Sequence, residues 1–201
     1  MDDRGDEIRL LGISGSLRKG SWNTALLRAA AELAPGGARV GTFDLAEVPP
    51  YDQDRDDQAG GSDPPATVLE LRRRIVAADA MVIASPEYNW SYSGTVKNAI
   101  DWCSRPGFKS ILVGVPALLI GASGGPAGTG RAQLHLRQVL LSTRTPVLID
   151  ALQVANAAAC FDDELCLTDP ALRDQLADLL RLLCAEVERE RGGRALPVGG
   201  A

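Results

Sequence analysis

The sequence predicts an α/β domain in which a five-stranded parallel sheet is covered by helices on both faces, a three-layer, doubly wound architecture. Two observations lead to this prediction. Short apolar runs and segments of helical periodicity alternate along the chain as five β-then-α units. The run at residues 80–84 is apolar throughout, which is typical of a strand buried on both faces of a parallel sheet. The crossovers between such strands are right-handed.

The first two expected strands flank a short amphipathic helix. Residues 8–13 form the first apolar run, and the polar residues 14–16 stop it. Within residues 23–33, leucine and alanine recur at spacings of four and three, which predicts a helix. A Pro-Gly-Gly sequence at 35–37 ends that helix, and the second strand is expected at 39–44.

Residues 49–65 are the one low-complexity segment, and they carry five aspartates. Their polarity predicts a mobile surface loop. Helical spacing returns with Val68, Leu71 and Ile75. The arginine run at 72–74 within that helix is interpreted as its solvated face.

The second half of the chain continues the same alternation. We expect further strands at 117–121 and 146–151, with helices at 95–104, at about 131–142 and from Asp169 onward. The last helix carries a clean stripe of leucines. Residues 1–191 are expected to form a single domain, and residues 192–201 a flexible C-terminal tail.

Composition excludes several classes of function. The chain has 21 basic and 26 acidic residues among 201, a net charge of −5, which disfavours nucleic-acid binding through a broad basic surface. It has no apolar run near the ~20 residues that a membrane span needs, and its acidic N-terminus is not a secretory signal. We therefore expect a cytoplasmic protein without membrane contact.

The cysteines do not indicate a metal site. Cys103, Cys160, Cys166 and Cys184 contain no C-x-x-C pair, and His135 is the one histidine. We interpret the four as free core thiols in a reducing compartment. His135 is interpreted as a partly buried or interface residue, and no catalytic acid or metal ligand is assigned.

Three loops are candidates for a ligand site, because ligands of open parallel sheets bind at the carboxyl ends of the strands. After the first strand, hydroxyls, an amide and a guanidinium precede a helix; they belong to Ser14, Ser16, Ser21 and Thr24, to Asn23 and to Arg18. Together with the helix N-terminus they suit a terminal monophosphate, while their spacing fits neither triphosphate nor dinucleotide motifs. A simply capped βα turn, with Ser21 or Asn23 as N-cap, explains them equally well.

The other two loops favour a flat ligand. Residues 85–95 bring Tyr88, Trp90, Tyr92 and the Asn89 amide directly after a buried strand, a mixture that suits stacking and edge hydrogen bonds. The alternative is a proline-led turn whose aromatics pack on the next helix. Glycines within 121–130 would let backbone approach a ligand, or would simply form a flexible turn.

Four motifs in order resemble the NAD(P)H-dependent FMN reductase family, which includes quinone, chromate and azo-dye reductases. They are GSLRKGSWN at 15–23, PEYN at 86–89, GTVKNAIDW at 94–102 and the segment 121–140 with its RAQLHLRQVL sequence. The resemblance covers roughly residues 8–150. It implies a flavodoxin-like fold with strand order 2-1-3-4-5.

The resemblance also implies an FMN-dependent oxidoreductase. Electrons would pass from NADPH or NADH through bound FMN to a quinone-like or other small acceptor, in a ping-pong sequence. The residues implied for the FMN phosphate are Ser16, Arg18, Ser21, Asn23 and Thr24, and those implied for the isoalloxazine are Pro86, Glu87, Tyr88, Asn89, Ser123 and Gly124. A homodimer or homotetramer is implied as well, with the helix after Asn89 near the interface.

Two departures from the family pattern lie at the mouth of this site. Tyr92-Ser93-Gly94 stands where relatives usually have Ile-Pro-Gly, and Gly124-Gly125-Pro126 stands where they commonly have Pro-Gly-Gly. Both bear on substrate preference more than on FMN binding.

The same fold also supports other functions. A flavodoxin-type electron carrier or a flavin-dependent regulatory protein would bind FMN without NAD(P)H turnover. A phosphatase would need a cysteine in the first loop, and a serine hydrolase a histidine late in the chain; residues 14–21 contain no cysteine, and no histidine follows His135.

Overall fold

One parallel sheet of five strands organises the chain. The computed structural model describes residues 7–194. The strand order is β2-β1-β3-β6-β7, and every neighbouring pair is parallel. The strands are β1 (Ile8–Ser14), β2 (Ala38–Phe43), β3 (Ala80–Ala84), β6 (Ala117–Ala122) and β7 (Leu152–Val154). This order confirms the predicted fold class, since β6 and β7 are the fourth and fifth strands of the sheet.

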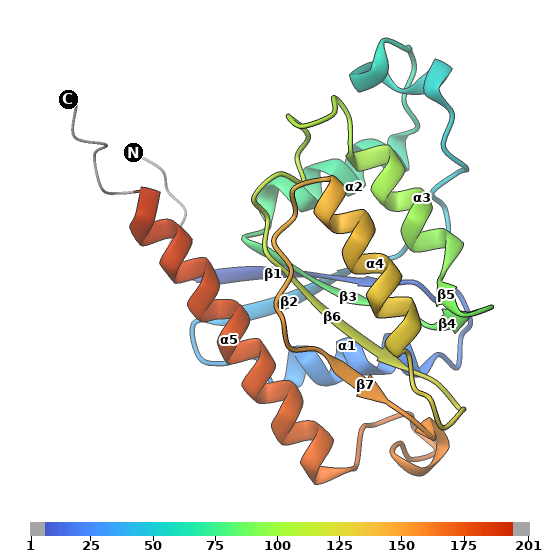
Figure 1. The fold of residues 1–201 in the computed structure, drawn as a ribbon, viewed down its shortest axis with the longest axis vertical. Helices are drawn as coiled ribbons and strands as arrows, with labels where there is room; N and C mark the ends of the chain where they lie inside the picture. The colour runs from blue at the N-terminus through green and yellow to red at the C-terminus, as the bar shows by residue number, and fades with distance from the viewer. Residues whose placement is uncertain (1–6, 195–201) are drawn as a thin grey trace.

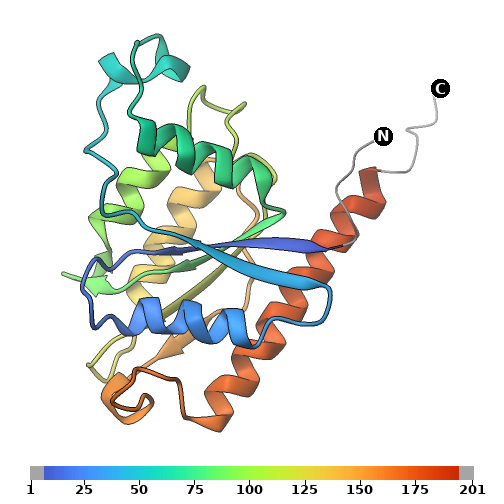
Figure 2. The same ribbon diagram turned by 180° about the vertical axis from the view of Figure 1, so that it is seen from behind.

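Five helices cover the two faces of this sheet. They are α1 (Trp22–Glu32), α2 (Ala66–Ala77), α3 (Gly94–Cys103), α4 (Gly130–Ser142) and α5 (Pro170–Arg194). In Figure 2, α1 and α2 lie on opposite sides of the sheet. The core is accordingly divided in two, with α1 and α5 packing on one face and α2, α3 and α4 on the other. Neighbouring residues of β3 show the alternation, because Val82 belongs to the first cluster and Ile83 to the second.

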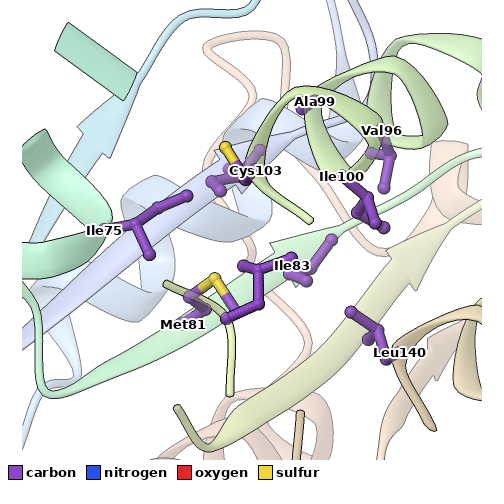
Figure 3. A pocket seen from close by; sticks show the side chains of 10 residues that line it. Ile75, Met81, Ile83, Val96, Ala99, Ile100, Cys103 and Leu140 are labelled. Carbon is purple, nitrogen blue, oxygen red and sulfur yellow. The ribbon is translucent and has the colours of Figure 1, made fainter. Parts of the chain in front are cut away.

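The second core cluster contains a small gap, shown in Figure 3. Its volume is about 20 Å³, and its lining includes Ile83, Cys103 and Leu140. A space of this size without polar partners does not hold ordered water, so it is a packing defect rather than a binding site. Burial raises the pKa of the Cys103 thiol to about 12, which keeps it neutral.

The fifth strand lies further along the chain than predicted. It was expected at residues 146–151, but β7 begins at Leu152, and Val147 makes only an isolated bridge to Ala117. Ile149 is 91% exposed, so the chain leaves the sheet edge between these two contacts. An apolar run with strand propensity does not by itself fix which residues pair.

The aspartate-rich segment is tied to the domain, contrary to the expectation of a mobile loop. It contains two short 3₁₀ turns, at Gln53–Arg55 and Asp57–Ala59. The guanidinium of Arg72 donates to Asp56 Oδ1 at 2.5 Å, to Asp57 Oδ1 at 2.6 Å and to the carbonyl oxygen of Trp102. The interpretation of the arginine run as a solvated face is therefore wrong for Arg72, which is buried.

The last helix begins as expected and continues further. The Asp169 side chain accepts a hydrogen bond from Leu172 N, which caps α5. The helix includes residues 192–194, where the tail was expected to begin, and the rest of that tail, 195–201, lies outside the described residues.

The cysteines divide between core and surface. Cys103 and Cys184 are buried, as expected, whereas Cys160 is half-buried and Cys166 exposed, so the interpretation of all four as core thiols is wrong.

Candidate functional site

Three loops meet at the carboxyl edge of the sheet. They are the loop between β1 and α1, the segment after β3 that contains the β4 (Glu87–Tyr88) and β5 (Ser91–Tyr92) hairpin, and the loop between β6 and α4. Figure 1 shows all three at the right-hand side of the molecule. The parallel topology therefore brings the three candidate loops to one place, as the sequence predicted.

The loop after β1 ends in a capped helix. Ser21 is the N-cap of α1, and its hydroxyl accepts a hydrogen bond from Thr24 N at 3.2 Å. The hydroxyls of Ser14 and Thr24 are 2.9 Å apart. The capped-turn interpretation with Ser21 is thus confirmed, and it does not exclude a ligand above the same turn.

A surface pocket of about 330 Å³ adjoins this loop. Of the residues expected at a phosphate, Ser14, Ser16, Arg18 and Thr24 line it. Lys19 adds a second cation and Asp44 a carboxylate. The guanidinium of Arg18 lies 5.3 Å from the ring centroid of Trp22, which holds it by a cation–π contact. Two cations with several hydroxyls are suited to an anionic group such as a phosphate.

Asn23 has a different environment. Its buried amide donates to the carbonyl oxygen of Ala122 and accepts from Ala122 N, both at 3.0 Å. The pair of bonds ties the start of α1 to the end of β6. Neither Asn23 nor Ser21 lines the pocket, so a phosphate contact from either residue stays a prediction.

Gly15 joins the first loop to the second. A Cβ at this position would lie 2.9 Å from Val96 Cγ2 and closer still to Ser93 Oγ, so only glycine fits without displacement. The Thr95 hydroxyl donates to Gly15 O at 2.8 Å. Ser93 caps α3 at Val96 N, and its own N–H donates to the Ser85 hydroxyl at 3.2 Å. A proline at position 93 would lack that N–H.

Glu87 fastens the hairpin to α4. Its carboxylate accepts from the backbone N–H groups of Arg131 at 3.1 Å and Ala132 at 3.2 Å, and from Arg131 Nε at 2.7 Å. Burial alone would raise the pKa of this carboxyl, but the hydrogen bonds and charge of Arg131 outweigh burial and hold the pKa below its ordinary value. A carboxylate at a helix N-terminus is also favoured by the helix dipole.

The turn of the hairpin is exposed. Asn89 and Trp90 have positive φ, at 49° and 68°. The side chain of Tyr88 is 52% exposed and that of Trp90 is 70% exposed. Pro86 at the base is buried. Residues 86–89 are the part of this segment expected at the isoalloxazine. Among them, Tyr88 and Asn89 present open side chains, while the Glu87 carboxylate is hydrogen-bonded to α4.

His135 lies beside this hairpin. Its Nδ1 is 3.1 Å from the Ser91 hydroxyl, and the residue is exposed. The expectation of partial burial is wrong, and a role at a subunit interface stays a prediction.

The loop after β6 completes the arrangement. The Ser123 hydroxyl accepts from Gly125 N at 3.2 Å. A Cβ at Gly124 would lie 3.4 Å from Trp22 Cζ3, so this loop packs closely against the first one. The backbone of Ser123 and Gly124 is held at the same edge as the hairpin, and a ring between them stays a prediction.

Sequence reasoning missed two residues that assemble the site, Trp22 and Arg131. One signal was present for Arg131: a cation in the first turn of a helix is disfavoured by the helix dipole, which indicates a nearby carboxylate. Trp22 carried no comparable signal, because only the fold brings it to Arg18 and Gly124.

Within residues 7–194, no group of three or more His, Cys, Asp or Glu side chains could hold a metal ion. None of the helices in this range is long and apolar enough to span a membrane.

Known proteins similar in sequence to this chain include flavin and quinone reductases. Residues 8–159 match the sequence model of the NADPH-dependent FMN reductase family. The chain is 43% identical over 188 residues to an NAD(P)H-dependent FMN reductase of Pseudomonas aeruginosa, which covers 93% of this chain and 99% of the relative. It is 41% identical over 137 residues to a quinone reductase of Escherichia coli, 68% of this chain and 71% of the relative.

A solved structure gives the same result. The flavoenzyme NAD(P)H:(acceptor) oxidoreductase of Paracoccus denitrificans superposes with a TM-score of 0.79 at 32% identity, covering 90% of this chain and 98% of that one.

Replacing Glu87 by glutamine is expected to destabilise the apoprotein by about 1–3 kcal/mol at neutral pH, because the N–H groups at the start of α4 and the Arg131 guanidinium lose a charged acceptor. The folded pKa lies below the unfolded value of about 4.3, so this stabilisation is complete above that value and is lost as the pH falls through the folded pKa. The difference in the free energy of unfolding between wild type and Glu87→Gln should therefore be constant near neutrality and shrink on acidification.

Urea unfolding at several pH values measures this difference. Glu70→Gln is the control, since it removes an exposed pairing with Arg73 on α2 and should have no measurable effect. If the free-energy difference between wild type and Glu87→Gln did not change with pH, the lowered pKa of Glu87 in the folded protein would be contradicted.

Proposed function

The chain belongs to the NADPH-dependent FMN reductase family, and we propose that its three loops together hold FMN and present it to NAD(P)H and a quinone-like acceptor. Like its family, the chain is an FMN-dependent oxidoreductase that uses NAD(P)H. The observation that carries the proposal is the convergence of the three motif loops, joined by Asn23, Gly15 and Glu87, beside a pocket with two cations.

The phosphate of FMN is assigned to the loop between β1 and α1. Arg18 supplies the charge, and the hydroxyls of Ser16 and Thr24 supply donors beside the N-terminus of α1. Ser14 and Lys19 line the same pocket. The pocket has room for a phosphate group, and its cations and hydroxyls are suited to bind one.

The isoalloxazine is assigned to the two remaining loops. Tyr88 and Asn89 offer exposed groups on one side, and the backbone of Ser123 and Gly124 offers polar groups on the other. Pro86 sets the start of the hairpin. Glu87 orients the hairpin, since its carboxylate accepts hydrogen bonds from α4.

FMN, when bound, supplies the redox chemistry, accepting a hydride from NAD(P)H and passing electrons to the second substrate. The chain's own residues bind the cofactor and orient it. Arg18 neutralises the phosphate, and the Glu87 and Asn23 hydrogen bonds keep the loops at fixed separation. This division of labour requires no protein nucleophile.

The acceptor class follows from the relatives. A relative of this chain is a quinone reductase, and a quinone is a flat two-electron acceptor that suits an open site lined by aromatic side chains. We place the enzyme in the cytoplasm, which agrees with four cysteines that form no disulfide. The electron-carrier and regulatory alternatives gain no support from the family match.

A homo-oligomer is also proposed, with α4 at the interface. Leu134 and Leu141 are seven residues apart, so they share a face of α4, and both are exposed. Ile149 follows that helix and is almost fully exposed. Apolar side chains grouped in this way are typical of subunit contacts. The helix that the resemblance placed near the interface, α3, belongs to the same layer.

Arg18→Ala is expected to weaken FMN binding by about 1.5–3 kcal/mol, the contribution of a hydrogen bond to a charged group, or roughly 10- to 150-fold in Kd. Fluorescence titration of the apoprotein with FMN measures it. Arg181→Ala, an exposed arginine on α5, is the control and should leave the Kd unchanged. Equal affinities in the two variants would remove Arg18 from the phosphate site.

Steady-state kinetics test the proposed reaction. With NADPH varied at several fixed concentrations of 1,4-benzoquinone, double-reciprocal plots are expected to be parallel, because the first product leaves before the acceptor binds. With the apoprotein, the rate should depend on added FMN. Intersecting lines would contradict the ping-pong sequence, and an FMN-independent rate would contradict the cofactor.

Sedimentation velocity tests the oligomer. Wild type is expected at two or four times the 21.2 kDa chain mass, and Leu141→Glu at a lower mass, because a charge cannot be buried in an apolar contact. Leu182→Glu, an exposed leucine on α5, is the matched control. A monomeric wild type would refute the oligomer, and an unchanged Leu141→Glu mass would move the interface elsewhere.

A further inference from the structure

We propose that Trp90 and Arg131 form the platform on which the quinone acceptor docks, with the quinone ring on the free face of the indole and a quinone carbonyl oxygen on the guanidinium. This inference rests on the proposed function and names the residues that select its second substrate.

Trp90 is held outward at an energetic cost. It occupies the second position of the two-residue hairpin turn between β4 and β5, with φ 68°, where glycine is the preferred residue. A bulky L-residue is strained in this left-handed conformation. Its indole is 70% exposed, so burial does not repay that cost. A strained and exposed tryptophan beside a site suggests a role in function.

One face of the Trp90 indole packs against Arg131. The guanidinium of Arg131 lies 4.6 Å from the ring centroid, and Glu87 fixes that guanidinium in turn through Nε and one terminal nitrogen. Within the described part of the chain, the other terminal nitrogen of Arg131 donates no hydrogen bond. The pair thus presents an open aromatic surface with N–H donors beside it.

The location and chemistry match a quinone. The hairpin follows β3 directly, and α4 follows the glycine-rich loop, so Trp90 and Arg131 stand where both ring-binding loops end. Indole is electron-rich and quinones are electron-poor and flat, which favours stacking. A quinone carbonyl oxygen accepts hydrogen bonds and gains negative charge on reduction, which a guanidinium stabilises.

Calorimetric titration of 1,4-naphthoquinone into the oxidised holoenzyme, without NADPH, measures docking apart from turnover. Trp90→Gly is expected to weaken binding about tenfold, because a stacked aromatic pair and its buried area are lost. Trp90→Phe keeps a ring and should recover most of the affinity. Glycine adopts positive φ without strain, so Trp90→Gly should melt no lower than wild type.

Phe108→Gly is a matched control. Phe108 also has positive φ, at 62°, is exposed, and lies under an arginine, Arg144, at 4.8 Å, but it follows α3 rather than β3. The Phe108→Gly variant should bind the quinone with wild-type affinity. This control separates strain and cation–π pairing in general from the position of Trp90.

The outcomes are distinct. Weaker quinone binding in Trp90→Gly alone, with wild-type FMN affinity and sedimentation mass, supports the platform. Equal quinone affinity in wild type and Trp90→Gly overturns it, as does a wild type that binds no quinone, or a parallel loss of FMN that makes Trp90 part of the flavin site. Failure of the proposed function is detected separately, as an absence of FMN binding or of NADPH turnover.

Discussion

The hydrogen bonds between the Glu87 carboxylate and the N-terminus of α4 are the constraint on which the candidate site depends. Sheet hydrogen bonds align the strands, but they leave the loops at the strand ends free. Glu87 joins the loop after β3 to the helix after β6. Asn23 joins the helix after β1 to β6 in the same way. Removing the Glu87 carboxylate would take away the acceptor shared by the start of α4 and the Arg131 guanidinium, and would release the hairpin.

Several residues of the three loops therefore hold the site together through contacts with the protein itself. Ser21 caps a helix, Asn23 pairs with backbone, Glu87 holds α4, and Ser93 caps α3 while bonding to Ser85. The side chains left open include Arg18, Tyr88, Asn89 and Trp90. The chemistry of an FMN reductase is consistent with this division, because the cofactor reacts and the protein must hold two substrates in turn beside it.

The fold was predictable because its signals are local. Apolar runs of strand length alternate with helical periodicity, and the order of the sheet follows from the family resemblance. Two errors came from contacts distant in sequence. The burial of Arg72 depends on Asp56, sixteen residues earlier, and periodicity contains no information on that pair. The start of β7 at Leu152 depends on its register with Ile120, whereas the apolar run before it satisfied the strand pattern equally well.

The candidate site was predictable as a place and only in part as a set of contacts. Strand ends and motif loops identify the edge of the sheet, but the direction of a side chain depends on its neighbours in space. The family resemblance implies Glu87 at the ring, but it carries no information on its partner Arg131, which lies forty-four residues away. The leucines that flank His135 predict partial burial, yet α4 turns this side chain toward solvent and Ser91.

The most direct test of the account is the visible absorption spectrum of the FMN-loaded protein, freed of excess FMN and titrated anaerobically with NADPH and then with a quinone. The account predicts retained oxidised-flavin bands that NADPH bleaches and the quinone restores. Retained bands that NADPH does not bleach, or a protein that retains no FMN, would contradict it.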